Sequence, residues 1–322
     1  MRVTLGAYAA AAQDWDTAEL GSFYAALSDL PGIGGLELPA AHLDLLATGA
    51  AGRALPDRWD YEVTSLPGTM TALRGSAGYG LASVSAAGRA AAIADAEDTR
   101  AAVARFNDAL GRPAVRTVTL VSAPVRDPQA RDGTSRAALA DSLGDLVSRD
   151  WHGAGLVIEH CDAAVPGQVA AKGFLDLDDE LDVLGALPGT PALAVINWGR
   201  SAIERRDPAA PARHAAQARG RGLLGGVVLS GCADTASAWG PPWADTHLPP
   251  AGVRPPGGAQ HESLMNQRHM TDFLRAAGPD ARVAVKLSAR PRDRDRQTRV
   301  RFLVEAVDEV RRAWTTAHAA AA

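Results

Sequence analysis

The sequence predicts a (β/α)8 barrel, in which eight parallel strands form an inner barrel and helices surround it. Eight short apolar runs recur along the 322 residues, and stretches with helical periodicity separate them. A hydrophobic content of 47% suits one large core, and barrels of this kind routinely reach this length. No glycine-rich phosphate turn follows the first run, where the chain reads AAAAQDWD, and this disfavours a doubly wound open sheet.

Turn-forming residues bound the eight apolar runs, and these boundaries define the expected strands. The strands are predicted over residues 3–8, 32–39, 61–68, 115–124, 155–163, 192–199, 223–231 and 282–291. Helical spacing of apolar residues predicts helices over 85–111 and 135–150. The acidic start of 178–187 favours a helix there, and a barrel requires one around 297–316 after the last strand. We expect a single domain over residues 1–322. It would carry a long irregular loop at 231–262 and a disordered tail at 317–322.

Composition excludes several classes of partner. Charged residues make up 22% of the chain and the net charge is −4, so the clustered basic face that nucleic acid requires is not expected. The two cysteines form no disulfide framework, and no apolar stretch reaches the ~18 residues of a membrane span. The N-terminus resembles a strand more than a signal peptide. We therefore expect a cytoplasmic protein without a nucleotide cofactor, and association into a homodimer stays open.

Polar residues end five of the predicted strands, where a barrel places its active site. They are Glu37, Glu159, Asn197, Ser230 and Lys286. Glu159 follows three apolar residues, and a carboxylate there costs free energy unless it is paired or bound to a metal. The alternative is a salt bridge to a neighbouring base such as Lys286.

Lys286 lies in the apolar run VAVKLSA, and strand alternation allows its side chain to point into the barrel. A buried lysine can act as a general base or a Schiff-base amine, or it can neutralise Glu159 or Glu37. Glu37 shares a strand face with Gly35, which leaves room beside it. His160 directly follows Glu159 and must point to the opposite face, where a hydrogen-bonded histidine is expected.

The segments after the sixth and seventh strands supply further candidates. Asp245 and His247, in WADTHLP, are spaced so that both can reach one metal ion or one sugar hydroxyl, although loop aspartates commonly satisfy turn amides. Trp198 and Trp243 offer aromatic faces for a sugar ring, or ordinary packing. Arg200 can bind an anionic group.

Six motifs carry a family resemblance that covers nearly the whole chain. GLELP, TSLPGTM, LVIEHCDA, INWGRSAIE, LSGC with WADTHLP, and VKLSARP resemble, in this order, a bacterial family known as a domain of unknown function. That family is similar to the xylose-isomerase-like TIM barrels, which include sugar isomerases, sugar epimerases and metal-dependent endonucleases. The resemblance implies the same barrel fold and a carbohydrate substrate.

The resemblance also implies four positions at which metal ligands are expected. Sugar epimerases of this superfamily bind one divalent metal with carboxylates and a histidine from strands five to eight. Glu159 matches the first ligand, but Asn197, Ser230 and Lys286 stand at the other three positions. Asparagine is a weaker ligand, and a protonated lysine is none. Either the metal is lost, or a rebuilt site holds Mn, Co, Zn or Mg. The rebuilt set would be Glu159, Asp245 and His247.

The leading functional hypothesis is a carbohydrate isomerase or epimerase that transfers a proton next to a carbonyl. Glu159 would act as metal ligand or general base, and Lys286 would hold the oxyanion or act as general acid. Glu37 is a further catalytic candidate, with a purely structural role as the alternative. The expected substrate contacts are Asn197, Trp198, Arg200, Ser230, Trp243, Asp245 and His247. Three alternatives remain: a metal-free lyase or aldolase that uses Lys286, a glycoside hydrolase that uses Glu37 and Glu159, and a non-catalytic sugar-binding barrel.

Overall fold

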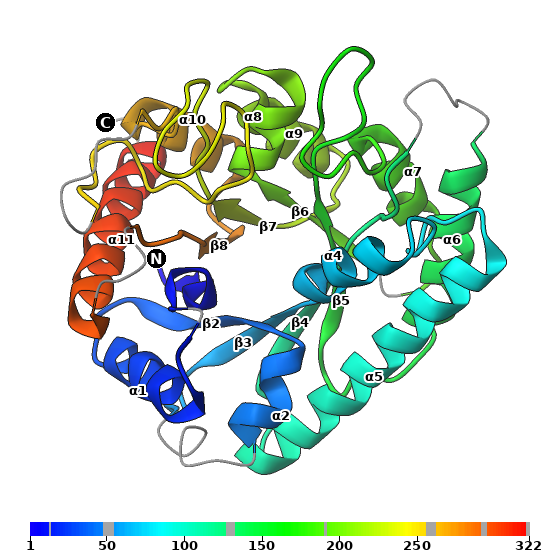
Figure 1. The fold of residues 1–322 in the computed structure, drawn as a ribbon, viewed down its shortest axis with the longest axis horizontal. Coiled ribbons are helices and arrows are strands. Elements are labelled where there is room, and N and C mark those ends of the chain that lie inside the picture. Colours follow the sequence, from blue (N-terminus) through cyan, green and yellow to red (C-terminus); the bar gives the residue numbers. More distant parts are fainter. Residues whose placement is uncertain are drawn as a thin grey trace.

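The computed structural model of the chain describes residues 1–12, 14–47, 55–126, 133–189, 192–255, 262–290 and 295–319. Eight parallel strands pair in sequence order, and the first pairs with the last, so the sheet closes into a barrel (Figure 1). The predicted fold class is confirmed. The strands are β1 (Val3–Leu5), β2 (Ile33–Pro39), β3 (Asp60–Thr64), β4 (Val115–Leu120), β5 (Gly155–His160), β6 (Leu193–Asn197), β7 (Leu224–Leu229) and β8 (Arg282–Val285).

Helices surround the strands in Figure 1, and four of them were predicted from the sequence. These four are α5 (Ala86–Leu110), α6 (Thr134–Val147), α7 (Leu177–Ala186) and α11 (Arg296–His318). The others are η1 (Ala7–Ala10), α1 (Thr17–Ser28), α2 (Ala41–Ala47), α4 (Leu66–Gly75), α8 (Trp198–Arg205), α9 (Ala210–Gly220) and α10 (Gln267–Ala277). No helix in the described ranges is both long and apolar enough to cross a membrane.

Several predicted strands extend too far at their C-terminal ends. The run 61–68 stops at Thr64, because α4 begins at Leu66 and Pro67 suits its first turn. The run 192–199 stops at Asn197, which caps α8. The run 282–291 stops at Val285, so Lys286 and Ser288 follow the strand and do not lie within it.

The structure also differs from the prediction in the loop after β7 and at the C-terminal tail. Gly231 and Leu248 form an isolated antiparallel bridge, so the loop after β7 folds back beside the strand end. Residues 256–261 of the predicted loop lie outside the described residues. Helix α11 continues to His318, whose ring lies 4.2 Å from that of Trp314, so the predicted tail starts too early. Residues 320–322 lie outside the described residues.

The barrel interior is layered. Four small apolar side chains, one from each of β5 to β8, form a buried cluster separate from the main core: Val157, Val195, Val228 and Ala284. Strand side chains alternate, so residues two positions further along point the same way. Those residues are Glu159, Asn197, Ser230 and Lys286. A polar layer therefore lies on the apolar one, toward the carboxyl ends of the strands.

The pairing of β2 with β3 depends on a glycine. A Cβ atom at Gly35 would lie 1.6 Å from the carbonyl oxygen of its partner Asp60. We expect Gly35→Ala to lower the free energy of unfolding by about 1–3 kcal/mol or more, because the backbone must shift. Urea unfolding measures this change. The control is Gly144→Ala in α6, where a Cβ meets nothing within 4 Å and alanine should raise stability by about 0.5–1 kcal/mol. Equal effects at the two positions would contradict the packing argument.

Candidate active site

A group of buried ion pairs lies at the carboxyl ends of the strands. The Nζ atom of Lys286 lies 2.7 Å from Oε1 of Glu37, which joins the ends of β8 and β2. Arg200 of α8 places Nη1 2.8 Å from Oε1 of Glu159 and Nε 3.3 Å from Oδ2 of Asp245. Glu37, Glu159, Lys286 and Arg200 are all at most 4% exposed. The structure therefore brings together all three predicted catalytic residues and two of the predicted substrate contacts.

Asn197 orients both partners of the Glu159–Arg200 pair. Its side chain ends β6 and caps α8, because Oδ1 accepts the backbone N–H of Arg200 at 3.3 Å. The Nδ2 atom of the same amide donates to Oε1 of Glu159 at 2.9 Å. One side chain thus fixes the start of α8 and the carboxylate that α8 binds.

The loops after β5 and β7 complete the polar group at its partly exposed rim. Lys172 donates from Nζ to Oδ2 of Asp245 at 3.0 Å. His247 places Nδ1 2.7 Å from Oγ of Ser230 and 3.4 Å from Oδ1 of Asp245. His247 and Trp243 have φ angles of 55° and 59°, which are rare for residues other than glycine. Such backbone strain clusters at ligand-binding sites.

Burial and neighbouring polar groups set the protonation states of the site residues. Burial alone would raise the pKa of Glu159, but Arg200, Lys286 and Asn197 outweigh it and lower this pKa to about 2. Burial opposes the charge of Lys286, yet Glu159 and Glu37 raise its pKa well above the ordinary value. Burial lowers the pKa of His247 to about 4. At neutral pH, Glu159 is therefore ionised, Lys286 is protonated and His247 is neutral.

Two buried polar atoms of the group make no hydrogen bond within the described structure. They are Oε2 of Glu37 and Nη2 of Arg200. Burial raises the pKa of Glu37 in spite of Lys286. A Cβ atom at Gly6 would lie 2.9 Å from the free oxygen of Glu37, so glycine is needed to leave that space open. Buried polar atoms are normally paired, and unpaired ones in a cluster are candidates for binding a ligand.

Tyr8 of η1 lies next to this group and is half-buried. The Nζ atom of Lys286 lies 5.4 Å from the centroid of its ring. Burial and the charge of Glu37 raise the pKa of Tyr8 above its ordinary value, so the phenol stays protonated and can donate a hydrogen bond.

The two candidate tryptophans lie in different surroundings. Trp198 is fully buried, and its ring lies 6.3 Å from that of His269 in α10, so it packs between helices and offers no surface to a substrate. Trp243 is half-buried at the loop, and Arg206 lies over its ring at 5.2 Å. The predicted role of Trp198 in binding substrate is therefore wrong, because α8 begins at this residue and turns it away from the barrel.

The donor set at the barrel mouth does not fit a divalent metal. Arg200 forms ion pairs with both Glu159 and Asp245. Its guanidinium group therefore occupies the position between the two carboxylates that a shared metal ion would need. Oδ2 of Asp245 is also engaged by Lys172, and the position expected to hold a glutamate ligand carries protonated Lys286. The rebuilt set of Glu159, Asp245 and His247 is thus not assembled around a common point, and we derive no step through a metal there.

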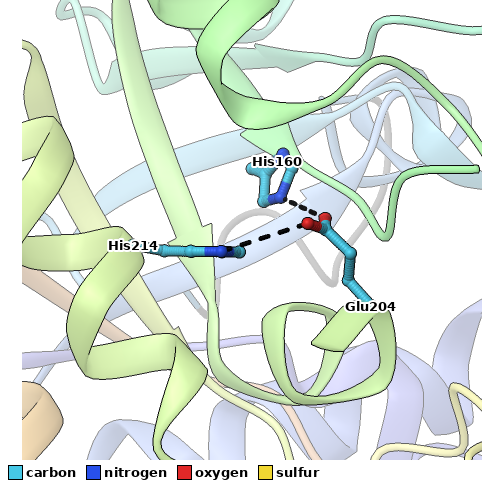
Figure 2. A group of neighbouring side chains, drawn as sticks. All are labelled: His160, Glu204 and His214. Carbon is cyan, nitrogen blue, oxygen red and sulfur yellow. Dashed lines mark hydrogen bonds and ion pairs between the residues drawn. The ribbon is translucent and has the colours of Figure 1, made fainter. Parts of the chain in front are cut away.

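A second polar cluster lies on the outer face of the same strand. His160 points away from the barrel interior, as alternation predicts, and places Nδ1 2.8 Å from Glu180 and Nε2 2.9 Å from Glu204. Although burial opposes it, these two carboxylates raise the pKa of His160 to about 10. His160, Glu204 and His214 offer ligand atoms that lie within 4.8 Å of one another, so this group is able to hold a metal ion (Figure 2).

Sequence reasoning missed the residues that partner the predicted ones. Lys172 and Tyr8 at the mouth, and Glu180, Glu204 and His214 behind β5, were not singled out. One available signal was rarity, because Lys172 is one of only two lysines. Another was spacing, because Arg200 and Glu204 stand four residues apart in INWGRSAIE and share a helix face.

Comparison with known proteins places the chain in a family. The family model described as a domain of unknown function, DUF4862, matches residues 4–302. The uncharacterized protein STM3670 of Salmonella typhimurium (strain LT2) is 34% identical over 262 residues, which cover 80% of this chain and 79% of that protein. The chain belongs to the DUF4862 family, as its motifs indicated.

Solved structures share the fold at low sequence identity. The crystal structure of D-psicose 3-epimerase in the presence of D-fructose superposes with a TM-score of 0.59 and 15% identity, covering 97% of this chain and 99% of that one. A xylose isomerase domain containing protein from Salmonella typhimurium LT2 gives a TM-score of 0.56 and 11% identity, covering 92% and 93%. These likenesses show that the chain shares the (β/α)8 barrel fold with these proteins.

Arg200 should be essential for stability as well as for the site. Arg200→Met leaves Glu159 and Asp245 buried without their shared cation, and breaking a buried pair in this way costs about 3–5 kcal/mol. Urea unfolding should show that loss. Arg105→Met is the matched control, because Arg105 pairs with Asp44 at the exposed surface and should change stability little. A wild-type transition in Arg200→Met would refute the buried pairing.

Proposed function

We propose that this member of the DUF4862 family is an isomerase or epimerase of a small carbohydrate, and that it transfers a proton on a carbon next to a carbonyl. The observation that carries the proposal is the buried Glu37–Lys286 pair, whose carboxylate keeps one oxygen free. The proposal also draws on the barrel that the chain shares with D-psicose 3-epimerase. Such a reaction needs a base near the carbon and positive charge near the carbonyl oxygen.

Glu37 is the best candidate for the base. Lys286 holds Oε1 at 2.7 Å, while Oε2 has no hydrogen-bond partner among the described residues and can accept a proton. Burial raises its pKa, and a carboxylate with a raised pKa is a stronger base near neutral pH than an ordinary one. The free oxygen, the neighbouring ammonium and the space left by Gly6 make this carboxylate suited to proton transfer.

Two fixed cations can stabilise the charge that the reaction creates. Loss of a proton next to a carbonyl places negative charge on the carbonyl oxygen, and donors held in advance stabilise it best. Lys286 contributes an ammonium group, and Arg200 contributes Nη2, which donates to no atom of the described residues. The phenol of Tyr8 adds a third donor beside Lys286.

Glu159 has a different role from the one that its sequence position suggested. With a pKa of about 2 and with Arg200 and Asn197 both bound to Oε1, it is a weak base. We assign it as a positioning residue that holds Arg200 toward the substrate. Ser230, Asp245 and His247, with Lys172, lie where they can bind the hydroxyl groups of a carbohydrate.

Glycoside hydrolysis is the second candidate, because one observation favours it. Burial raises the pKa of Glu37 while cations lower that of Glu159, and paired carboxylates with separated pKa values suit an acid and a nucleophile. Assays with free sugars and with glycosides distinguish the two reactions. Hydrolysis releases a new reducing sugar from a glycoside, whereas isomerisation exchanges a carbon-bound hydrogen of a free ketose or aldose.

Proton exchange on free sugars tests the leading proposal. We expect the chain, incubated with ketoses and aldoses in D2O, to place deuterium on a carbon next to the carbonyl of at least one of them, as seen by NMR. Glu37→Gln should slow this exchange by about 10²–10⁴-fold, because the amide cannot accept the proton. Glu309→Gln, which alters a partly buried ion-paired carboxylate on α11, should leave the rate unchanged. Exchange at the wild-type rate in Glu37→Gln would exclude Glu37 as the base.

Lys286 should not act as an amine nucleophile. Its ion pair with Glu37 and its raised pKa keep Nζ protonated, and a protonated amine forms no Schiff base. Borohydride reduction in the presence of the sugar that shows exchange should therefore leave the mass of the tryptic peptide containing Lys286 unchanged. A reduced adduct on this peptide would transfer the assignment to the lyase or aldolase alternative.

A further inference from the structure

The cluster behind β5 lies outside the barrel interior and takes no part in the proposed reaction. His160 ends β5, Glu204 lies in the last turn of α8, and His214 lies in the middle of α9. Figure 2 shows both imidazole rings directed at the carboxylate of Glu204. The three side chains are buried, and the most exposed of them, His214, is only 7% accessible.

Both histidines are oriented so that the same ring atom is presented. The Nδ1 atom of His160 is bound to Glu180 at 2.8 Å, and that of His214 lies 3.1 Å from the hydroxyl of Ser201. Each Nε2 atom therefore faces Glu204, at 2.9 Å from Oε2 and 4.0 Å from Oε1 respectively. A carboxylate or hydroxyl partner on the second nitrogen is the usual way in which metal-binding histidines are held.

Among the described residues, buried acidic groups outnumber buried cations in this part of the core. Glu180 and Glu204 bring two buried carboxylates, against one histidine between them. The other cations near the cluster are Arg205, which is half exposed and 2.9 Å from Oε1 of Glu204, and exposed Arg213. A dication would neutralise both carboxylates with neutral histidines.

We propose that His160, Glu204 and His214 bind one Zn²⁺ ion, a site distinct from the barrel mouth. Two histidine nitrogens and a carboxylate form a donor set that zinc accepts, with bond lengths of about 2.0–2.2 Å. Tetrahedral geometry then places ligand atoms about 3.4 Å apart, between the 2.9 Å and 4.0 Å observed here. Glu204 supplies one oxygen to the ion, and three protein ligands leave the fourth position to a water molecule.

This ion would join three elements of the barrel wall. It would tie the end of β5 to α8 and α9, and α8 carries Arg200, which binds Glu159 at the mouth. The ion has a positioning role in this arrangement and contacts no reacting atom. Its presence does not depend on the reaction proposed above.

Elemental analysis of the purified chain, with any affinity tag removed, tests the proposal. After incubation with Zn²⁺ and removal of excess, we expect one zinc per chain in the wild type. His214→Gln and Glu204→Gln should weaken binding at least about 100-fold, and Ser201→Ala, which frees Nδ1 of His214, about 10–100-fold. Circular dichroism establishes that each variant is folded, and His214→Gln keeps the test valid where Glu204→Gln does not fold.

Two controls locate the ion. His152→Asn removes a histidine elsewhere at a position with φ of 55°, which asparagine tolerates, and should keep its zinc. Glu159→Gln alters the barrel mouth and should also keep its zinc. Co²⁺ in place of zinc should give the strong visible absorption of a tetrahedral centre in the wild type, and none in His214→Gln. No zinc in the wild type, zinc lost only in Glu159→Gln, or zinc retained in both Glu204→Gln and His214→Gln would overturn the proposal.

Discussion

The contact between β5 and α8 is the constraint on which both polar clusters depend. Glu159 and His160 are consecutive and point to opposite faces of the strand, while Arg200 and Glu204 lie one helical turn apart. On the inner face, the carboxylate of Glu159 pairs with the guanidinium of Arg200. On the outer face, the imidazole of His160 pairs with the carboxylate of Glu204. One helix therefore compensates two buried charges of one strand, and a shift of α8 would leave both without partners.

The strands and long helices were predictable because their burial is one-sided or complete over enough residues to leave a pattern. Helix α8 was not predicted, although the motif INWGRSAIE contains most of it. It follows β6 without a connecting loop, and its eight residues are too few to show a helical repeat. Its start is encoded by one residue, Asn197, which also ends the strand.

The strand-end residues of the site were predictable because alternation and barrel topology place them together whatever their partners are. Their partners were not, since they come from distant parts of the chain. Lys286 and Glu37 are 249 residues apart, and Lys172 and Asp245 are 73 apart. Arg200 was indistinct among the arginines of the chain until burial set it apart.

The charges at the barrel mouth are not needed to fill its interior. One layer below, small apolar side chains from β5 to β8 fill the barrel interior, so an apolar layer is compatible with this barrel. A buried ion pair often contributes no more stability than apolar residues of equal volume. The pairs of Glu37 with Lys286 and Glu159 with Arg200 therefore call for another explanation, and it lies in their free atoms. Within the described part of the chain, each pair leaves one polar atom without a hydrogen bond, a carboxylate oxygen in the first and a guanidinium nitrogen in the second. A base and an oxyanion donor, each held by its own counter-ion, are what proton transfer next to a carbonyl requires.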